Sequence, residues 1–160
     1  MKAELISHKK QSISLHLYSG QLDEALALMQ RAMRLSPHYP AWYASVLAAI
    51  QNNLGNHEEA IVLAEQLIAR LPQSGWGRPE LLHALARLGR LDEAKRVLDD
   101  ALERDPGFSI QADREGMQRC CPRTAKMMEE RESALRLAGV PEQPPRAGED
   151  RPSIAVLPFV

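Results

Sequence analysis

Apolar residues recur at helical spacing through the middle of the chain, and short polar turns interrupt them at regular intervals. One stripe falls at positions i, i+1, i+4 and i+7 and comprises Leu81, Leu82, Leu85 and Leu88. The segment after the next turn carries a second stripe, which comprises Val97, Leu98, Ala101 and Leu102. Spacing of this kind places the apolar side chains on one face of an α-helix. The pattern therefore predicts pairs of amphipathic helices joined by turns.

A short motif marks each predicted helix pair and occurs three times, at residues 20–25, 55–60 and 89–94. It consists of a glycine, an acidic pair three residues later and an alanine directly after that pair. The glycines are 35 and 34 residues apart, and closing prolines keep the same spacings at Pro37, Pro72 and Pro106. Two further columns align, made of Ala32, Leu67 and Ala101 and of Met29, Ala64 and Leu98. The chain thus contains an internal repeat of about 34 residues.

Each column has a local physical reason. The glycine stands where one helix ends, a place where left-handed backbone is accessible mainly to glycine. The acidic pair falls in the first turn of the next helix, where the helix dipole favours negative charge. The alanine lets that helix approach its neighbour closely, and the proline ends it because proline cannot continue a helix. Each unit is therefore predicted to be helix, turn, helix.

These columns resemble the tetratricopeptide repeat over roughly residues 7–106. The resemblance implies an all-α fold, a right-handed α-solenoid of about three helix pairs. We expect repeats at about residues 6–38, 41–73 and 75–107, within a solenoid domain of residues 1–140. The sequence departs from the family pattern in the middle of the first helices, where the usually small position holds Ile13, Ala48 and Leu82.

The chain after the third repeat breaks the period. Residues 108–139 keep a helical character and are predicted to be capping helices, with an apolar face that includes Met117, Ala125, Met128, Leu135 and Ala138. An open solenoid end needs such a cover. Residues 141–151 are rich in proline and are predicted to be a solvated linker. Residues 152–160 are predicted to be a short strand with no partner of its own.

Three stretches resemble a narrower family, the tetratricopeptide regions of multidomain bacterial adenylate cyclases and related regulators. They are residues 36–43 between two repeats, residues 105–109 with 134–142 at the end of the solenoid, and residues 151–159. The last stretch is similar to the opening strand of an α/β domain beside such repeats. The resemblance implies a fragment of a larger regulator. The metal-binding aspartate motif of the cyclase domain is missing from the sequence, so cyclase activity is not expected here.

The first helices of the resembled repeats line a concave groove in which partner peptides lie. Aligning the copies places ten side chains on this face, namely Lys10, Ser14, Tyr18, Trp42, Ser45, Asn52, Asn53, Trp76, His83 and Arg87. Polar side chains with aromatic residues among them suit peptide contacts. An ordinary solvated face, with Trp42 packed between repeats, is the alternative that the sequence leaves open. Only Lys10 fits the carboxylate-binding pattern of the chaperone-binding subgroup, so that specialisation is not expected.

Charge and candidate chemistry narrow the function classes. The chain has 20 basic and 21 acidic residues. This balance lacks the excess of positive charge that indicates binding to nucleic acid or to a membrane surface. The histidines lack the i, i+4 spacing of a helical metal site. The neighbouring Cys120 and Cys121 offer too few ligands for zinc. We therefore expect no cofactor, no metal and no enzymatic activity. No signal peptide or bilayer span is expected either, and a reducing cytoplasm is the predicted compartment.

Two functions remain after these exclusions. The first is a protein-interaction scaffold that binds a peptide or helix in the concave groove. The alternative is a non-catalytic regulatory or oligomerising fragment of a larger cyclase-type or transcriptional regulator. In that case the strand at residues 152–160 would pair with another domain or another chain. The other chain could be a second copy of the same protein.

Overall fold

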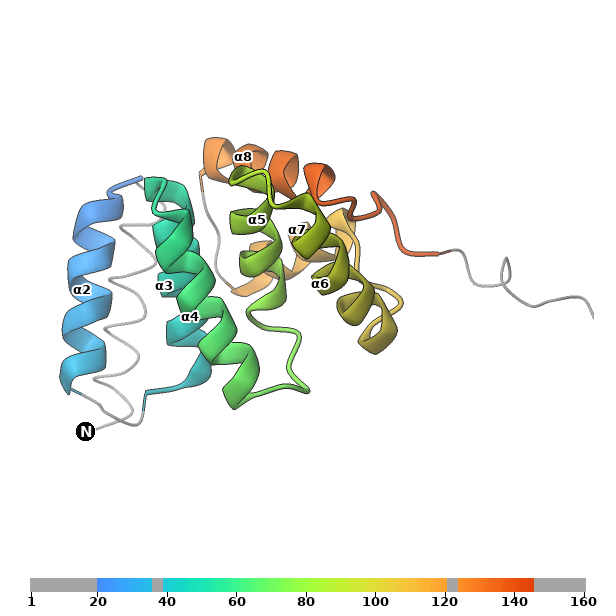
Figure 1. The fold of residues 1–160 in the computed structure, drawn as a ribbon. Coiled ribbons are helices and arrows are strands. Elements are labelled where there is room, and N and C mark those ends of the chain that lie inside the picture. Colours follow the sequence, from blue (N-terminus) through green and yellow to red (C-terminus); the bar gives the residue numbers. More distant parts are fainter. Residues whose placement is uncertain (1–19, 36–38, 121–123, 146–160) are drawn as a thin grey trace, which may run out of the picture.

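The computed structural model describes residues 20–35, 39–120 and 124–145. This part of the chain is helical, with turns and irregular links between the helices (Figure 1). The helices in chain order are α2 (Leu22–Leu35), α3 (Ala41–Leu54), α4 (His57–Arg70), α5 (Arg78–Arg87), α6 (Leu91–Arg104), α7 (Ile110–Cys120) and α8 (Ala125–Leu137). The all-α class predicted from the periodicity is confirmed for these residues.

The glycine of the repeated motif ends a helix as predicted. Gly55 closes α3 with φ 84°, and its amide donates to the carbonyl of Asn52 at 3.2 Å. The amide of Asn56 donates to the carbonyl of Gln51 at 2.9 Å. This pair of bonds is the Schellman arrangement, which satisfies the last carbonyls of a helix and needs left-handed backbone. The equivalent glycines, Gly20 and Gly89, have φ of 75° and 71°.

The conserved positions within the three repeat copies lie in the packed interior of the fold. The motif alanines Ala25, Ala60 and Ala94 are all fully buried. The columns that contain Met29 and Ala32 are buried in each copy as well. Because a methyl group takes up little room, a helix can approach its neighbour closely there. These contacts join the helices into two hydrophobic clusters.

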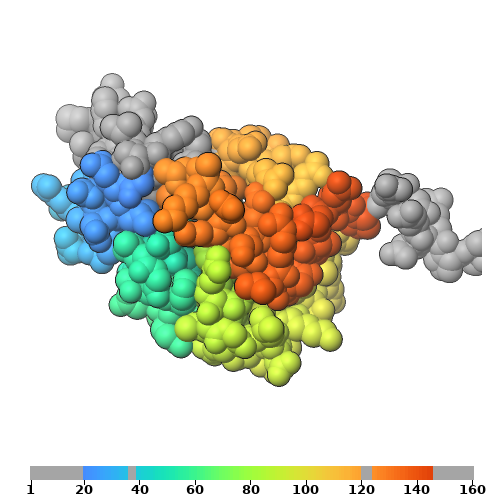
Figure 2. Space-filling model, turned by 90° about the horizontal axis from the view of Figure 1, so that it is seen from above, coloured from blue at the N-terminus to red at the C-terminus, as the bar shows by residue number. Residues whose placement is uncertain are grey.

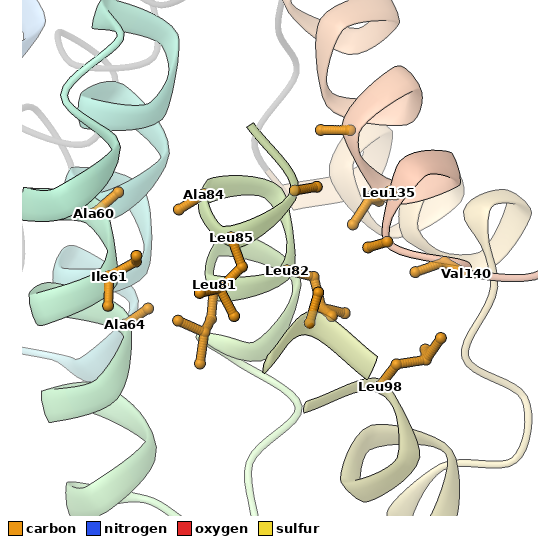
Figure 3. Close-up of a cluster of buried hydrophobic side chains, with 14 of the residues drawn as sticks. Ala60, Ile61, Ala64, Leu81, Leu82, Ala84, Leu85, Leu98, Leu135 and Val140 are labelled. Carbon is orange, nitrogen blue, oxygen red and sulfur yellow. The ribbon is translucent and has the colours of Figure 1, made fainter. Parts of the chain in front are cut away.

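The two clusters divide the solenoid along its length. The first joins α2 and α3, and it includes Met127 from α8. The second joins α4, α5 and α6 with the end of α8 (Figure 3). Leu82 on α5 and Leu135 on α8 are fully buried in the second cluster. Helix α8 therefore belongs to both clusters and connects the two parts of the core.

Helix α8 does not continue the regular row of helices. It runs over the top of the molecule, across α5 (Figures 1 and 2). Thr124 caps its N-terminus, since the Thr124 hydroxyl accepts a hydrogen bond from the amide of Met127 at 3.3 Å. A side-chain cap of this kind is worth about 1 kcal/mol. The expected capping helix is present, but it lies across the repeats as well as beyond them.

The buried face of α8 differs from the one predicted. Met127, Arg131, Ala134 and Leu135 are buried. Ala125 is exposed and Met128 is only partly buried. The expectation that Ala125 would face the core was therefore wrong. The reason is that the buried stripe runs at i, i+4, i+7 and i+8 from Met127 and includes Arg131, which an apolar pattern does not identify.

The first residues of the predicted linker are attached to the solenoid. The carbonyls of Pro141 and Glu142 accept hydrogen bonds from the amides of Ile110 and Gln111, at 2.9 and 3.0 Å. Val140, just before them, is buried. The start of the linker at residue 141 is thus bonded to the first turn of α7. The rest of the linker from residue 146, and the predicted strand at 152–160, lie outside the described residues.

Candidate partner-binding site

The structure describes most of the side chains predicted to line a groove. Those on α3 are Trp42, Ser45, Asn52 and Asn53, and those on α5 are His83 and Arg87. Trp76 lies in the loop before α5, because α5 begins only at Arg78. The three from the N-terminal segment, Lys10, Ser14 and Tyr18, fall outside the described residues.

Two of the predicted groove residues lie in the interior. The exposed fraction of Asn52 is 3%, and its Nδ2 donates to the backbone carbonyl of Glu80 at 2.9 Å. Asn52 Oδ1 lies 3.1 Å from His57 Nδ1. His83 is 2% exposed, and its ring centroid lies 6.1 Å from that of His57. These polar side chains join α3, α4 and α5 inside the fold and do not face solvent.

The neighbouring groove position Arg87 is exposed but is bonded to α8. The Nη2 of Arg87 donates to the backbone carbonyl of Glu130 on α8 at 2.7 Å. Ala49 and Ala86, on the same stretch of α3 and α5, are 1% and 6% exposed. Asn53 donates to the carbonyl of Ala49 within its own helix at 2.7 Å. Near the C-terminal ends of α3 and α5 the alanines are therefore buried, Asn53 is partly buried and Arg87 stays exposed.

The remaining predicted residues meet at an open hollow. Trp42, Ser45 and Trp76 line a cavity of about 330 Å³. Its other walls include the start of α5, residues of α7 and α8, and the loop before α7 with Phe108. Trp76 is 45% exposed, although an indole of this size usually buries more of its surface. The sequence alignment of the repeats thus identified three side chains that the fold brings to one place.

The loop that carries Trp76 is held by a buried arginine. Arg78 donates to the carbonyls of Ser74 and Pro72 at 2.7 and 3.0 Å, and to Asp100 on α6 at 2.7 Å. The Trp76 amide also donates to the Ser74 hydroxyl at 3.1 Å. The hydrogen bond from Arg78 lowers the pKa of Asp100, and Arg104 lowers it further. Residues 72–76 therefore have a defined position despite their exposure.

The inner wall of the hollow contains an ion network that the sequence did not reveal. Arg131 on α8 donates from Nη1 to Glu80 Oε2 at 2.7 Å. Its Nε and Nη2 donate to the two oxygens of Asp113 on α7, at 2.7 and 2.8 Å. All three residues line the cavity and are 9% exposed or less. The network joins α5, α7 and α8 at the wall of the hollow.

The guanidinium of Arg131 keeps its charge despite its burial. Burial opposes the charge of Arg131, but the two carboxylates outweigh it and raise its pKa above the usual value. Breaking such a buried ion pair by removing one partner typically costs about 3–5 kcal/mol, because a buried charge is left without compensation. Glu80 and Asp113 therefore serve first to hold α8, and the wall they form has a fixed geometry.

A second hollow, of about 390 Å³, lies between α4, α5 and α6. None of the predicted groove residues lines it. Arg78 and Asp100 at this hollow are bonded to each other. Its apolar floor, with Leu81 and Leu85, belongs to the core that joins these helices. We therefore regard the hollow at Trp76 as the candidate site.

Two kinds of site receive no support from the described residues. Within residues 20–35, 39–120 and 124–145, no group of three or more His, Cys, Asp or Glu side chains could hold a metal ion. Over the same part of the chain, no helix combines the length and the apolar character needed to cross a bilayer.

Comparison with known proteins supports the repeat. The family model described as Tetratricopeptide repeat matches residues 16–78 and 53–113. A solved structure titled MamA AMB-1 is 24% identical, with 76% of this chain and 68% of that chain covered and a TM-score of 0.52. A structure titled MamA MSR-1 is 22% identical, with 79% and 71% covered and a TM-score of 0.53. At these identities the two structures show a shared helical-repeat fold.

Proposed function

Because the chain belongs to the tetratricopeptide repeat family, we propose that it is a protein-interaction scaffold that binds a partner segment in the hollow at Trp76. The observation that carries the proposal is the meeting of Trp42, Ser45 and Trp76 at one open cavity. The repeat register alone predicts these three residues on one face, and the fold brings them to the same cavity. Tryptophan is also among the residues that contribute most to protein interfaces.

The burial of the groove residues indicates which part of the face a partner would use. Asn52 and His83 are closed off, whereas Trp76 is open and Trp42 is half-buried. An α-helix with its side chains is about 10–12 Å across, and α8 already lies over part of this face. We therefore propose an extended segment that inserts one or two large side chains into the 330 Å³ hollow.

A selection experiment tests this function. A display library of random peptides is selected on the wild-type chain, and the recovered peptides are then measured against Trp76→Ala and Leu137→Ala. Leu137 is 55% exposed on α8 and does not line the hollow. The proposal expects peptides whose binding is lost in Trp76→Ala and kept in Leu137→Ala. Recovery of peptides that bind all three proteins equally would contradict it.

The alternative function is less well supported. Neither the family match nor the two solved structures favours a fragment of a cyclase-type or transcriptional regulator. Self-association through residues 152–160 lies outside the described residues and stays a prediction, as do the cytoplasmic location and the expected lack of catalysis. The scaffold function with a protein partner is therefore the one that we develop.

A further inference from the structure

The walls of the hollow at Trp76 are mostly apolar and partly aromatic. The rings of Trp42, Trp76 and Phe108 line it together with the thioether of Met117. Trp76 is 45% exposed, so much of its indole is accessible to a ligand. Aromatic rings pack favourably against other aromatic rings, and a methionine sulfur also makes favourable contacts with them. Walls of this composition favour an aromatic side chain over a small aliphatic one.

The charged groups that line this hollow already have partners within the chain. On the inner wall, the guanidinium of Arg131 bonds the carboxylates of Glu80 and Asp113. On the rim, the carboxylate of Asp105 accepts a hydrogen bond from the amide of Gly107 at 3.0 Å. A charged group of a ligand would therefore have to compete with bonds that the fold has already made.

A smaller hollow of about 140 Å³ adjoins the first and contributes charges of the opposite sign. Arg78 and Arg104 line it, and both donate to the carboxylate of Asp100. Taken together, the walls of the two hollows carry three cations and three carboxylates, which are Arg78, Arg104, Arg131, Glu80, Asp105 and Asp113. The walls thus have no excess of either sign, and the ligand group that complements them is uncharged.

Helix α7 leaves room for a ligand at Gly116. Ala112, Gly116 and Met117 all line the hollow, and their spacing of i, i+4 and i+5 places them on one face of α7. Glycine in the middle of a helix is less stable than alanine. Among the described residues, no atom would lie within 4 Å of a Cβ added at Gly116, so packing within this part of the chain does not require a glycine. The close approach of a partner side chain to α7 would account for it.

From these observations we propose that the partner segment inserts an uncharged aromatic side chain into the hollow, against Trp76 and over Gly116 of α7. The inference rests on the proposed function and names the specificity of the same site. The ring buries apolar surface against Phe108 and Met117 and leaves the ion pairs of the walls intact. A volume of about 330 Å³ is at the lower end of the range for ligand pockets, which suits one large side chain.

Substitutions in the partner peptide test the chemistry of this specificity. Peptides that are selected on the wild-type chain and lose binding in Trp76→Ala are resynthesised with alanine, lysine or glutamate at each position in turn. Calorimetry then measures their binding to the wild-type chain. We expect one aromatic position in each peptide at which all three substitutions weaken binding by at least about tenfold, as for a residue that dominates an interface. If a charged or an aliphatic residue holds the decisive position, the aromatic specificity is wrong and the scaffold function stands.

A variant that fills the hollow from α7 tests the location. Gly116→Leu places a side chain where the ring is proposed to lie. Gln118→Leu is the control, because Gln118 is exposed on the same helix and does not line the hollow. We expect Gly116→Leu to melt at or above the wild-type temperature, since leucine favours a helix more than glycine does.

The same peptides should bind Gly116→Leu at least about tenfold more weakly than the wild-type chain, and Gln118→Leu as tightly as the wild-type chain. Equal binding to the two variants, or a lower melting temperature of Gly116→Leu, would overturn the inference and leave the scaffold function standing. If no selected peptide depends on Trp76, both proposals are wrong.

Discussion

Arg131 on α8 and Glu80 on α5 are joined by a hydrogen bond of 2.7 Å between Nη1 and Oε2, although they lie 51 positions apart in the chain. Their side chains are 1% and 2% exposed. Asp113 completes the pairing from α7. The last helix is therefore held against the repeats by a charged contact as well as by apolar packing. This contact also forms part of the wall of the candidate site.

We predict that Arg131→Ala destabilises the fold by about 3–5 kcal/mol, because the buried carboxylates of Glu80 and Asp113 lose the guanidinium that pairs with them. The measurement is equilibrium denaturation in urea. Arg136→Ala is the control on the same helix, since Arg136 is 45% exposed and pairs with Glu132 and Glu142. That change should cost less than about 1 kcal/mol. Equal losses in the two variants would contradict the proposed role of Arg131.

A second prediction concerns the backbone beside Trp76. Gly77 has φ 92°, and a Cβ there would lie 3.1 Å from the Ala64 carbonyl oxygen and from Ile68 Cγ1. Gly77→Ala should therefore destabilise the chain by about 1–3 kcal/mol. Gly75→Ala, in the same loop, meets nothing within 4 Å and should be nearly neutral. Thermal melting of both variants provides the comparison, and a stable Gly77→Ala protein would contradict this loop geometry.

A third prediction concerns the pH dependence of stability. Burial lowers the pKa of His57, and the charge of Arg87 lowers it further, from an ordinary value of 6.5. The unfolded chain therefore takes up a proton at a higher pH than the folded chain does. It follows that this histidine has no effect well above pH 6.5 and reduces stability as the pH falls below that value.

The titration of His57 can be followed by NMR. Its midpoint should lie below 6.5 in the wild-type chain and should rise in Arg87→Gln, where the repelling charge is removed. His57→Gln should weaken the loss of stability between pH 7 and about 5. A midpoint at or above 6.5 would contradict the effect of burial on the pKa of His57. An unchanged midpoint in Arg87→Gln would contradict the effect of the Arg87 charge.

A fourth prediction concerns Arg78, which bonds the loop before α5 to Asp100. Arg78→Ala removes three charge-assisted hydrogen bonds at a side chain that is 5% exposed, so we expect a loss of several kcal/mol. Amide exchange in residues 72–77 should become faster than in the wild-type chain. Arg104→Ala is the control, because Arg104 is 39% exposed and also bonds Asp100. If exchange in this loop stays unchanged, Arg78 does not position Trp76.

Local features of the fold could be predicted from the sequence. Gly55 ends a helix within a single turn, and Ala60 packs at a single contact between helices. The residue type alone therefore indicates the backbone conformation or the small size that each position needs. Arg131 could not be predicted in this way, because its partners come from two other helices and its local sequence does not identify them. Asn52 and His83 were assigned to an open groove for a related reason. The sequence pattern did not indicate that α8 lies across part of that face.

Trp76 is an intermediate case. The repeat register placed it on the groove face, and the structure places it at the hollow. The same register placed it in a helix, whereas it lies in a loop. The glycines at positions 75 and 77 on either side of it are the signal that could have indicated a loop.

The most direct test of the central claim is the fluorescence of the chain during titration with a peptide recovered from the display selection. The chain has two tryptophans, Trp42 and Trp76, and both line the hollow. Peptide binding there should bury the indoles and shift their emission to shorter wavelength, with the same saturation point that calorimetry gives. Saturation by calorimetry without any change in tryptophan emission would place the binding site elsewhere and contradict the account.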